Sequence, residues 1–197
     1  MRRRAVDLMK EGMTLFLEGV DDAVGIRRSS GRSRTAARVA TAWHQDLLAG
    51  YRQDPGAILS PIAARSTEDL IAARDLAFSS MCKHHLLPFS GKTHIAYAPD
   101  GRITGLSRLA RLVDCLSRRL QLQETLTREI ADAVQKHLAP AGAACIIEAA
   151  HACMTMRGSR KTEGRIVTVA FTGKYRRDPK ERREVMAVLG FGPGRRL

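Results

Sequence analysis

Two short clusters of cysteine and histidine have the composition of a metal site. Residues 82–85 are Cys-Lys-His-His, and residues 151–153 are His-Ala-Cys. Zinc binds thiolate sulfur and imidazole nitrogen, and a catalytic zinc site keeps three protein ligands and leaves the fourth position to water. The two clusters therefore predict a catalytic Zn²⁺ site with further imidazoles beside it that move protons. The predicted ligands are Cys82, His85 and Cys153, and the predicted proton carriers are His84 and His151.

The placement of the second cluster depends on the element that carries it. If residues 143–156 form one strand, alternation sends His151 and Cys153 to the same face. A different interpretation needs no metal, because buried cysteines and core histidines also occur at such spacings. The spacing alone leaves both interpretations open.

Other polar side chains suit a phosphorylated, nitrogen-rich ligand. Ser107, Arg108 and Arg111 begin a predicted helix, where backbone N–H groups and guanidinium groups favour phosphate oxygens. Arg157 follows the second cluster, and the pair 123–124, Gln-Glu, opens another predicted helix. A carboxylate there accepts paired N–H groups such as those of a guanine edge. Each of these residues, taken singly, is also typical of a solvated surface.

The periodicity of the apolar residues predicts an α+β fold. Strands in sequential pairs around a helical pair indicate a largely antiparallel sheet with helices on one face. A proline-containing connection suggests a boundary between an N-terminal helical segment, 1–65, and a catalytic domain, 66–197. Helices are predicted at 5–18, 35–50, 106–120, 123–138 and after Pro179, and strands at 69–80, 91–98, 143–156 and 165–175.

The composition restricts the class of protein. With 197 residues and 44% hydrophobic content, the chain can bury a core. No run approaches the roughly 20 apolar residues that span a bilayer, so we expect no membrane segment and a cytoplasmic location. The four cysteines form no Cys-x-x-Cys pair, which favours reduced thiols or metal ligands over disulfides.

The formal charge of +13 indicates a polyanionic partner, such as nucleic acid, an anionic membrane or a phosphorylated small molecule. A solvated basic surface is the plainer interpretation. Only 5% of the residues are aromatic, and no nucleic-acid-binding motif is recognisable. We therefore expect no specific nucleic-acid partner.

Four segments resemble the GTP cyclohydrolase I family in order and spacing: Met81–Phe89, Gly105–Arg111, Leu122–Glu124 and His151–Gly158. The resemblance covers residues 67–190 closely and 35–51 more loosely. It implies a tunnelling fold and a homodecamer of two face-to-face pentamers, with active sites between subunits. It also implies a zinc-dependent reaction that opens the imidazole ring of GTP, releases C8 as formate, and gives 7,8-dihydroneopterin triphosphate for folate or pterin synthesis.

The resemblance also implies roles for single residues. The zinc ligands and the two histidines match those of the family, and Ser107 joins His151 near the sugar. The implied guanine contacts are Gln123 and Glu124, and the implied triphosphate contacts are Arg108, Arg111, Arg157 and, from a neighbouring subunit, Arg38.

Two positions depart from the family pattern. Lys83 stands where the family usually has an acidic residue, and Thr41 stands where it usually has a lysine. These departures motivate an alternative function, a specialised paralogue that acts on another purine nucleotide in a pterin or 7-deazapurine pathway. A nitrile reductase of the same general fold is a further alternative, but it needs a cysteine free of metal, whereas Cys82 belongs to the predicted zinc triad.

Overall fold

The computed structural model describes residues 2–26, 31–64, 70–157, 160 and 163–192. The chain divides into two compact units, Met1–Ala49 and Gly50–Leu197. The boundary predicted at residue 65 falls outside the described residues.

The N-terminal unit is helical, as the sequence predicts. Helix α1 (Arg2–Val24) packs against α2 (Arg32–Ala42), and a single π-helical segment, η1 (Trp43–Leu47), follows. Arg32 on α2 forms an ion pair with Asp21 on α1, with 3.3 Å between Nη1 and Oδ2. This pair joins the two helices close to their connection.

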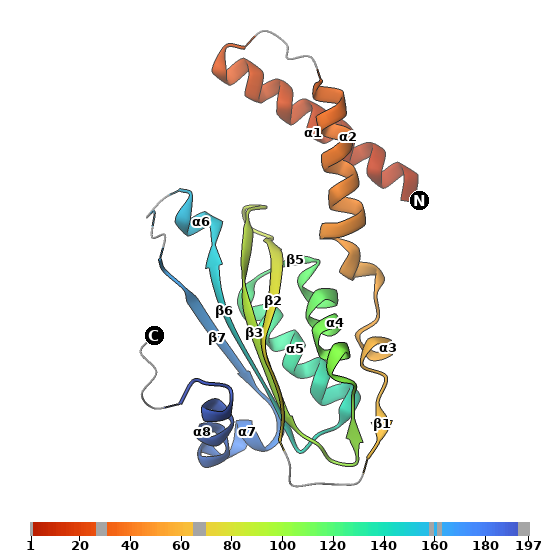
Figure 1. Cartoon of the computed structure of the whole chain (residues 1–197). Coiled ribbons are helices and arrows are strands. Elements are labelled where there is room, and N and C mark those ends of the chain that lie inside the picture. Colours follow the sequence, from red (N-terminus) through yellow and green to blue (C-terminus); the bar gives the residue numbers. More distant parts are fainter. Residues whose placement is uncertain (1, 27–30, 65–69, 158–159, 161–162, 193–197) are drawn as a thin grey trace. The chain divides into compact units, whose positions relative to one another are not determined.

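The second unit is built on a five-stranded sheet with the order β5-β2-β3-β6-β7 (Figure 1). All neighbours pair antiparallel except β5, which runs parallel to β2. This confirms the α+β class and the largely antiparallel sheet. The strands are β2 (Ile71–Cys82), β3 (Pro88–Ala98), β5 (Leu120–Gln121), β6 (Gly142–His151) and β7 (Ile166–Phe171), and a separate small sheet pairs β1 (Ile62–Ala63) with β4 (Arg102–Ile103).

Helices lie on both faces of this sheet. Along β3, Ile95 and Tyr97 belong to a core shared with α4 and α5, whereas Ala96 packs in a second core with Tyr175 and Leu189. The side chains of β3 alternate between the two faces and thus contribute to two cores. Helices α7 and α8 cover the second face, whereas the sequence predicted helices on one face only. The helical segments are η2 (Ala49–Arg52), α3 (Pro55–Leu59), α4 (Leu106–Ser117), α5 (Gln123–Leu138), α6 (Ala152–Thr155), α7 (Gly173–Arg177) and α8 (Pro179–Val188).

Two strands end earlier than predicted. The expected strand 143–156 ends at His151, which pairs with Phe89 in β3. The preceding residue of β3 is Pro88, which has no N–H to continue the ladder. The chain instead closes one helical turn, and the N–H of Met156 donates to the carbonyl of Ala152 at 2.9 Å. The expected strand 165–175 similarly ends at residue 171, before the short helix α7.

Candidate active site

The first cysteine–histidine cluster lies on a tight turn between β2 and β3. The N–H of Cys82 donates to the carbonyl of Leu87 at 2.9 Å, and the carbonyl of Cys82 accepts from Leu86 at 2.8 Å. Leu86 closes the turn with a φ of 53°. The thiol-bearing Cys82 is only 6% exposed, whereas both histidines of the turn are exposed.

Two of the three predicted zinc ligands lie at a suitable separation. The Sγ atom of Cys82 lies 3.7 Å from Nδ1 of His85. Zn–S and Zn–N bonds of about 2.3 and 2.0 Å at a tetrahedral angle place sulfur and nitrogen about 3.5 Å apart. The His84 ring stands edge-on to that of His85, with centroids 6.0 Å apart. The turn therefore presents a thiol and an imidazole as a metal would need them, with a second imidazole alongside.

The second cluster is divided between a strand and a helix. His151 is the last residue of β6, and Cys153 lies in α6, half-buried. The prediction that both side chains share a strand face is wrong, because the strand ends before Cys153. The β3–β6 register nevertheless sets α6 at the same end of the sheet as the β2–β3 turn (Figure 1).

The two clusters do not merge into a complete metal site. Within residues 2–26, 31–64, 70–157, 160 and 163–192, no three side chains of His, Cys, Asp or Glu are close enough to hold a metal ion. The structure thus brings Cys82 and His85 together and leaves Cys153 outside their group.

His151 is held by two different contacts. Its ring stacks on Phe89, with centroids 4.8 Å apart and planes 6° apart. Its Nε2 atom lies 2.7 Å from Oε1 of Gln123. Burial lowers the pKa of His151 below its usual value, and the negative charge of Glu124 opposes that shift. The imidazole therefore favours its neutral form at neutral pH.

Gln123, predicted as a guanine contact, is used inside the protein. It is 1% exposed, and its Nε2 atom lies 2.9 to 3.1 Å from two carbonyl oxygens and one hydroxyl. Glu124, the next residue, is exposed. The side chain that remains open for a ligand at the start of α5 is therefore the carboxylate. The partners of Gln123 Nε2 are Ile147 O, Ile166 O and Thr168 Oγ1.

The predicted phosphate-binding residues of α4 point to more than one surface. Ser107 is exposed in the first turn of the helix. Arg108 donates from Nη1 to the carbonyl of Ile58 at 3.3 Å, which ties α4 to α3. Arg111 is exposed and lines a hollow of about 390 Å³ together with Asp54 and Arg118. A guanidinium at this open position is accessible to an anion.

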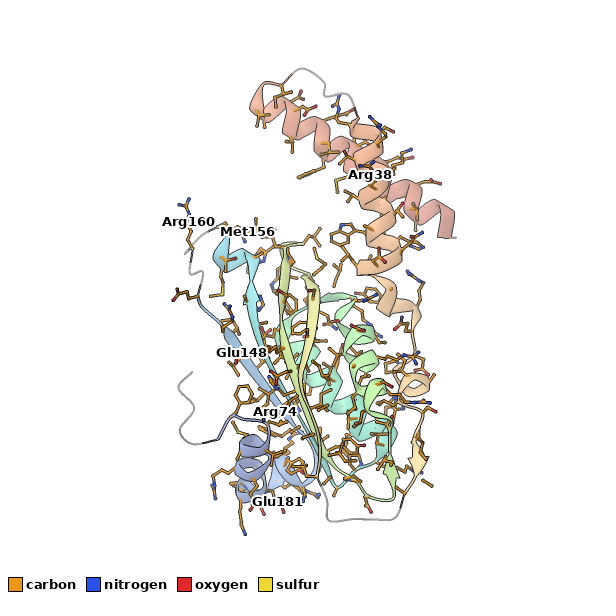
Figure 2. All side chains as sticks on the ribbon, viewed as in Figure 1. Arg38, Arg74, Glu148, Met156, Arg160 and Glu181 are labelled. Atoms are coloured by element: carbon orange, nitrogen blue, oxygen red, sulfur yellow. The ribbon has the colours of Figure 1, made fainter. Side chains whose placement is uncertain are left out.

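The remaining predicted residues are all exposed. Arg157 follows α6 and comes directly after Met156, which Figure 2 shows near the end of that helix. Arg38, also labelled in Figure 2, belongs to α2 of the N-terminal unit, where it lines a hollow of about 340 Å³. Of the two departures from the family pattern, Lys83 is exposed on the turn and Thr41 is exposed on α2.

Sequence reasoning gave no role to the residues that surround His151 and Gln123. Phe89 was part of a recognised motif, but only the sheet register places its ring against His151. Thr127 and Thr168 are separated by 41 residues, yet their hydroxyl oxygens lie 2.6 Å apart. Contacts of this kind depend on how strands and helices pair in space. The pattern of residues along the chain does not predict that pairing.

Among the described residues, no helix is both long enough and apolar enough to cross a membrane.

Comparisons with known proteins agree on one family. The family model described as GTP cyclohydrolase I matches residues 10–190. GTP cyclohydrolase 1 of Streptococcus pyogenes is 42% identical over 190 residues, which cover 95% of this chain and 97% of that protein. GTP cyclohydrolase 1 of Rhodopirellula baltica is 43% identical over 159 residues, 81% of this chain and 69% of that protein.

Solved structures are also similar to this chain. The apo form of the archaeosine synthase QueF-Like aligns with a TM-score of 0.46 and 17% identity, over 54% of this chain and 96% of that chain.

Proposed function

Because the chain belongs to the GTP cyclohydrolase I family, we propose that it hydrolyses GTP at C8 to formate and 7,8-dihydroneopterin triphosphate. One observation in the structure supports this assignment most. A buried thiol and an imidazole meet at 3.7 Å on the β2–β3 turn, at the same end of the sheet as a second, firmly held imidazole. Attack at a purine C8 requires both water activation and proton transfer, and these groups suit the two tasks.

The metal in this proposal is zinc, held by Cys82, His85 and Cys153. The sulfur–nitrogen separation of the first two ligands fits tetrahedral coordination by such donors. When bound, a zinc ion with three protein ligands would activate water at its fourth position. Cys153, which the structure leaves outside the Cys82–His85 pair, would have to approach from α6 to complete the site.

Proton transfer is assigned to His84 and His151, with Ser107 near the sugar. Burial lowers the pKa of His151 and favours its neutral form, so this imidazole is suited to accept a proton first. His84 is exposed on the turn beside His85 and is free to meet a substrate.

The proposed substrate contacts are charged groups, all of them exposed except Arg108, which is partly buried and bonded to Ile58. Glu124 would accept the paired N–H groups of the guanine edge. Arg108, Arg111 and Arg157 would bind the triphosphate, and Arg38 would be contributed by a neighbouring subunit. Gln123 would join guanine binding only through its backbone, because its side-chain amide is bonded within the protein.

Membership of the family also leads us to propose how copies of the chain assemble. We expect a tunnelling fold whose copies form a homodecamer of two pentamers, with active sites between subunits. Ten chains of 21.7 kDa give a particle of about 217 kDa. Light scattering on the purified protein measures this mass, and a monomeric active enzyme would exclude sites shared between subunits.

The decisive experiment is turnover of GTP by metal-analysed protein. Formate and the fluorescence of the oxidised pterin report the two products. We expect both to form together with about one zinc per chain. Absence of both products, with turnover of another purine nucleotide, would overturn the proposal in favour of the specialised paralogue.

That second candidate is motivated by the two departures from the family pattern, Thr41 and Lys83. The ammonium group of Lys83 is exposed on the turn that carries the proposed metal ligands, where it adds positive charge in place of the usual negative charge. A substrate with a different charge distribution would benefit from this change. Restoring the acidic residue by Lys83→Glu and comparing several purine nucleotides distinguishes the two candidates.

A further inference from the structure

The orientation of the Gln123 amide is fixed by its neighbours. One end of the amide faces the carbonyl oxygens of Ile147 and Ile166, at 3.1 and 2.9 Å. Carbonyl oxygens only accept hydrogen bonds, so the NH₂ group must occupy this end. If the amide were flipped, its own oxygen would face two other oxygens with no hydrogen between them. The amide oxygen of Gln123 must therefore point toward His151.

Two threonines support the same assignment. The hydroxyl of Thr127 donates to the backbone carbonyl of Gln123 at 2.7 Å. Because that hydroxyl has only one hydrogen, the contact of 2.6 Å between Thr127 and Thr168 must use the hydrogen of Thr168. The oxygen of Thr168 is then an acceptor for the Gln123 NH₂ group, 3.0 Å away. The NH₂ group has two hydrogens for its three acceptors, so one hydrogen is shared, and every partner at this end of the amide is an acceptor.

The assignment determines where the proton of His151 lies. An amide oxygen is only an acceptor, so Nε2 of His151 must carry a hydrogen and donate it across the 2.7 Å contact. In the neutral ring, the other nitrogen, Nδ1, then has a free lone pair. Among the residues that the structure describes, none forms a hydrogen bond with Nδ1 of His151. The stack on Phe89 holds the ring plane, and the bond to Gln123 holds its rotation.

We infer that Gln123 is a positioning residue that holds His151 as the Nε2–H tautomer, so that Nδ1 is the nitrogen that exchanges protons with the substrate. This inference rests on the proposed function and changes the role of Gln123 within it. The side chain acts through His151 and does not read the guanine base. A second group that orients the catalytic imidazole is a common feature of proton-transfer sites.

The test compares two buried glutamines. Gln123→Met removes the bond to His151 and keeps an unbranched side chain. Gln121→Met is the matched control, because Gln121 is also buried and its amide also donates two hydrogen bonds, to Leu116 O and Glu129 Oε2. We expect Gln123→Met to lower kcat for GTP about 10- to 100-fold with KM changed less than about threefold. Gln121→Met should retain kcat.

The opposite effect on kcat and KM would overturn the inference. If Gln123→Met raises KM and keeps kcat, the side chain binds substrate. If the wild-type enzyme turns over no GTP at all, the proposed function fails, and the tautomer must be measured directly.

That measurement does not depend on turnover or on the folding of any Gln123 variant. The ¹⁵N magic-angle-spinning spectrum of histidine-labelled wild-type protein, at mildly alkaline pH, gives the protonated nitrogen of each neutral ring. The signal of His151 is identified by its loss in His151→Ala. We expect protonation at Nε2, and protonation at Nδ1 would overturn the inference.

Discussion

The imidazole of His151 lies parallel to the ring of Phe89, with 4.8 Å between centroids and 6° between planes. The β3–β6 register creates this stack, because the two residues are directly opposite each other at the last pair of the ladder. Phe89 is 1% exposed and touches Phe78 edge-on, so its own position is fixed by the core. The imidazole proposed to transfer protons thus packs on a buried ring of the core.

Phe89→Leu should reduce both activity and stability. The change removes the flat surface that holds His151 and leaves a small cavity in the core. We expect kcat to fall about tenfold, which corresponds to about 1.4 kcal/mol, within the range measured for aromatic pairs. Unfolding free energy should fall by about 1 to 2 kcal/mol. Steady-state kinetics and urea denaturation measure the two effects.

Phe78→Leu separates the two effects. Phe78 packs in the same core, with its ring 5.8 Å from that of Phe89 at an interplanar angle of 75°. Its replacement should destabilise the protein to a similar extent and leave kcat within about twofold. Equal losses of kcat in the two variants would show that activity follows stability and not the stack.

Cys82→Ser should abolish both metal binding and turnover. A serine hydroxyl is a poor zinc ligand compared with a thiolate, and Cys82 is the most buried member of the proposed triad. We expect zinc content to fall below about a tenth of the wild-type value and kcat to fall by about 10³-fold or more. Elemental analysis and the GTP assay on the same preparation report both quantities.

The control for this variant is Cys145→Ala. Cys145 is fully buried, and burial raises the pKa of its thiol, so it does not ionise as a ligand would. Cys145→Ala should keep the full zinc content and kcat. Full zinc occupancy in Cys82→Ser would contradict the proposed site.

The sequence predicted those features that repeat along the chain. The apolar period located α5 at the observed residues, Gln123–Leu138, and predicted four main strands in their observed succession along the chain. Local spacing also brought together Cys82 and His85, two of the proposed zinc ligands, which lie on one turn. Because the two residues are only three positions apart, their contact can be predicted without knowing how the sheet is arranged.

The features that could not be predicted depend on partners distant in sequence. Strand β6, which carries His151, ends opposite the start of β3 at Pro88. The types of residues 152–156 alone do not predict this end of the strand. The burial of Gln123 is similar, because its acceptors lie on β6 and β7. From the sequence alone, Gln123 resembles a ligand contact because it lies beside Glu124 at the start of a helix. Only the position of the sheet shows that its side chain is buried.

Arg111→Ser should weaken triphosphate binding. The guanidinium is exposed on α4 beside a hollow of about 390 Å³, where it can form charge-assisted bonds with phosphate oxygens. Loss of one such contact is worth about 1.5 to 3 kcal/mol, so KM for GTP should rise about 10- to 100-fold. Arg118→Ser is the control, since Arg118 lines the same hollow but has no proposed phosphate contact. An equal rise in both variants would indicate a general effect of surface charge.

Gly91→Ala should destabilise the sheet that carries the site. A Cβ atom at Gly91 would lie 2.0 Å from the backbone oxygen of Glu148 and 2.6 Å from Cα of Ala149, so β3 and β6 would have to separate. We expect a loss of about 3 kcal/mol or more, or about 6 to 12 °C in Tm. Gly12→Ala is the control, because no atom lies within 4 Å of its added Cβ on α1. It should leave Tm unchanged or raise it, since alanine favours a helix. An unchanged Tm in Gly91→Ala would contradict the close approach of the two strands.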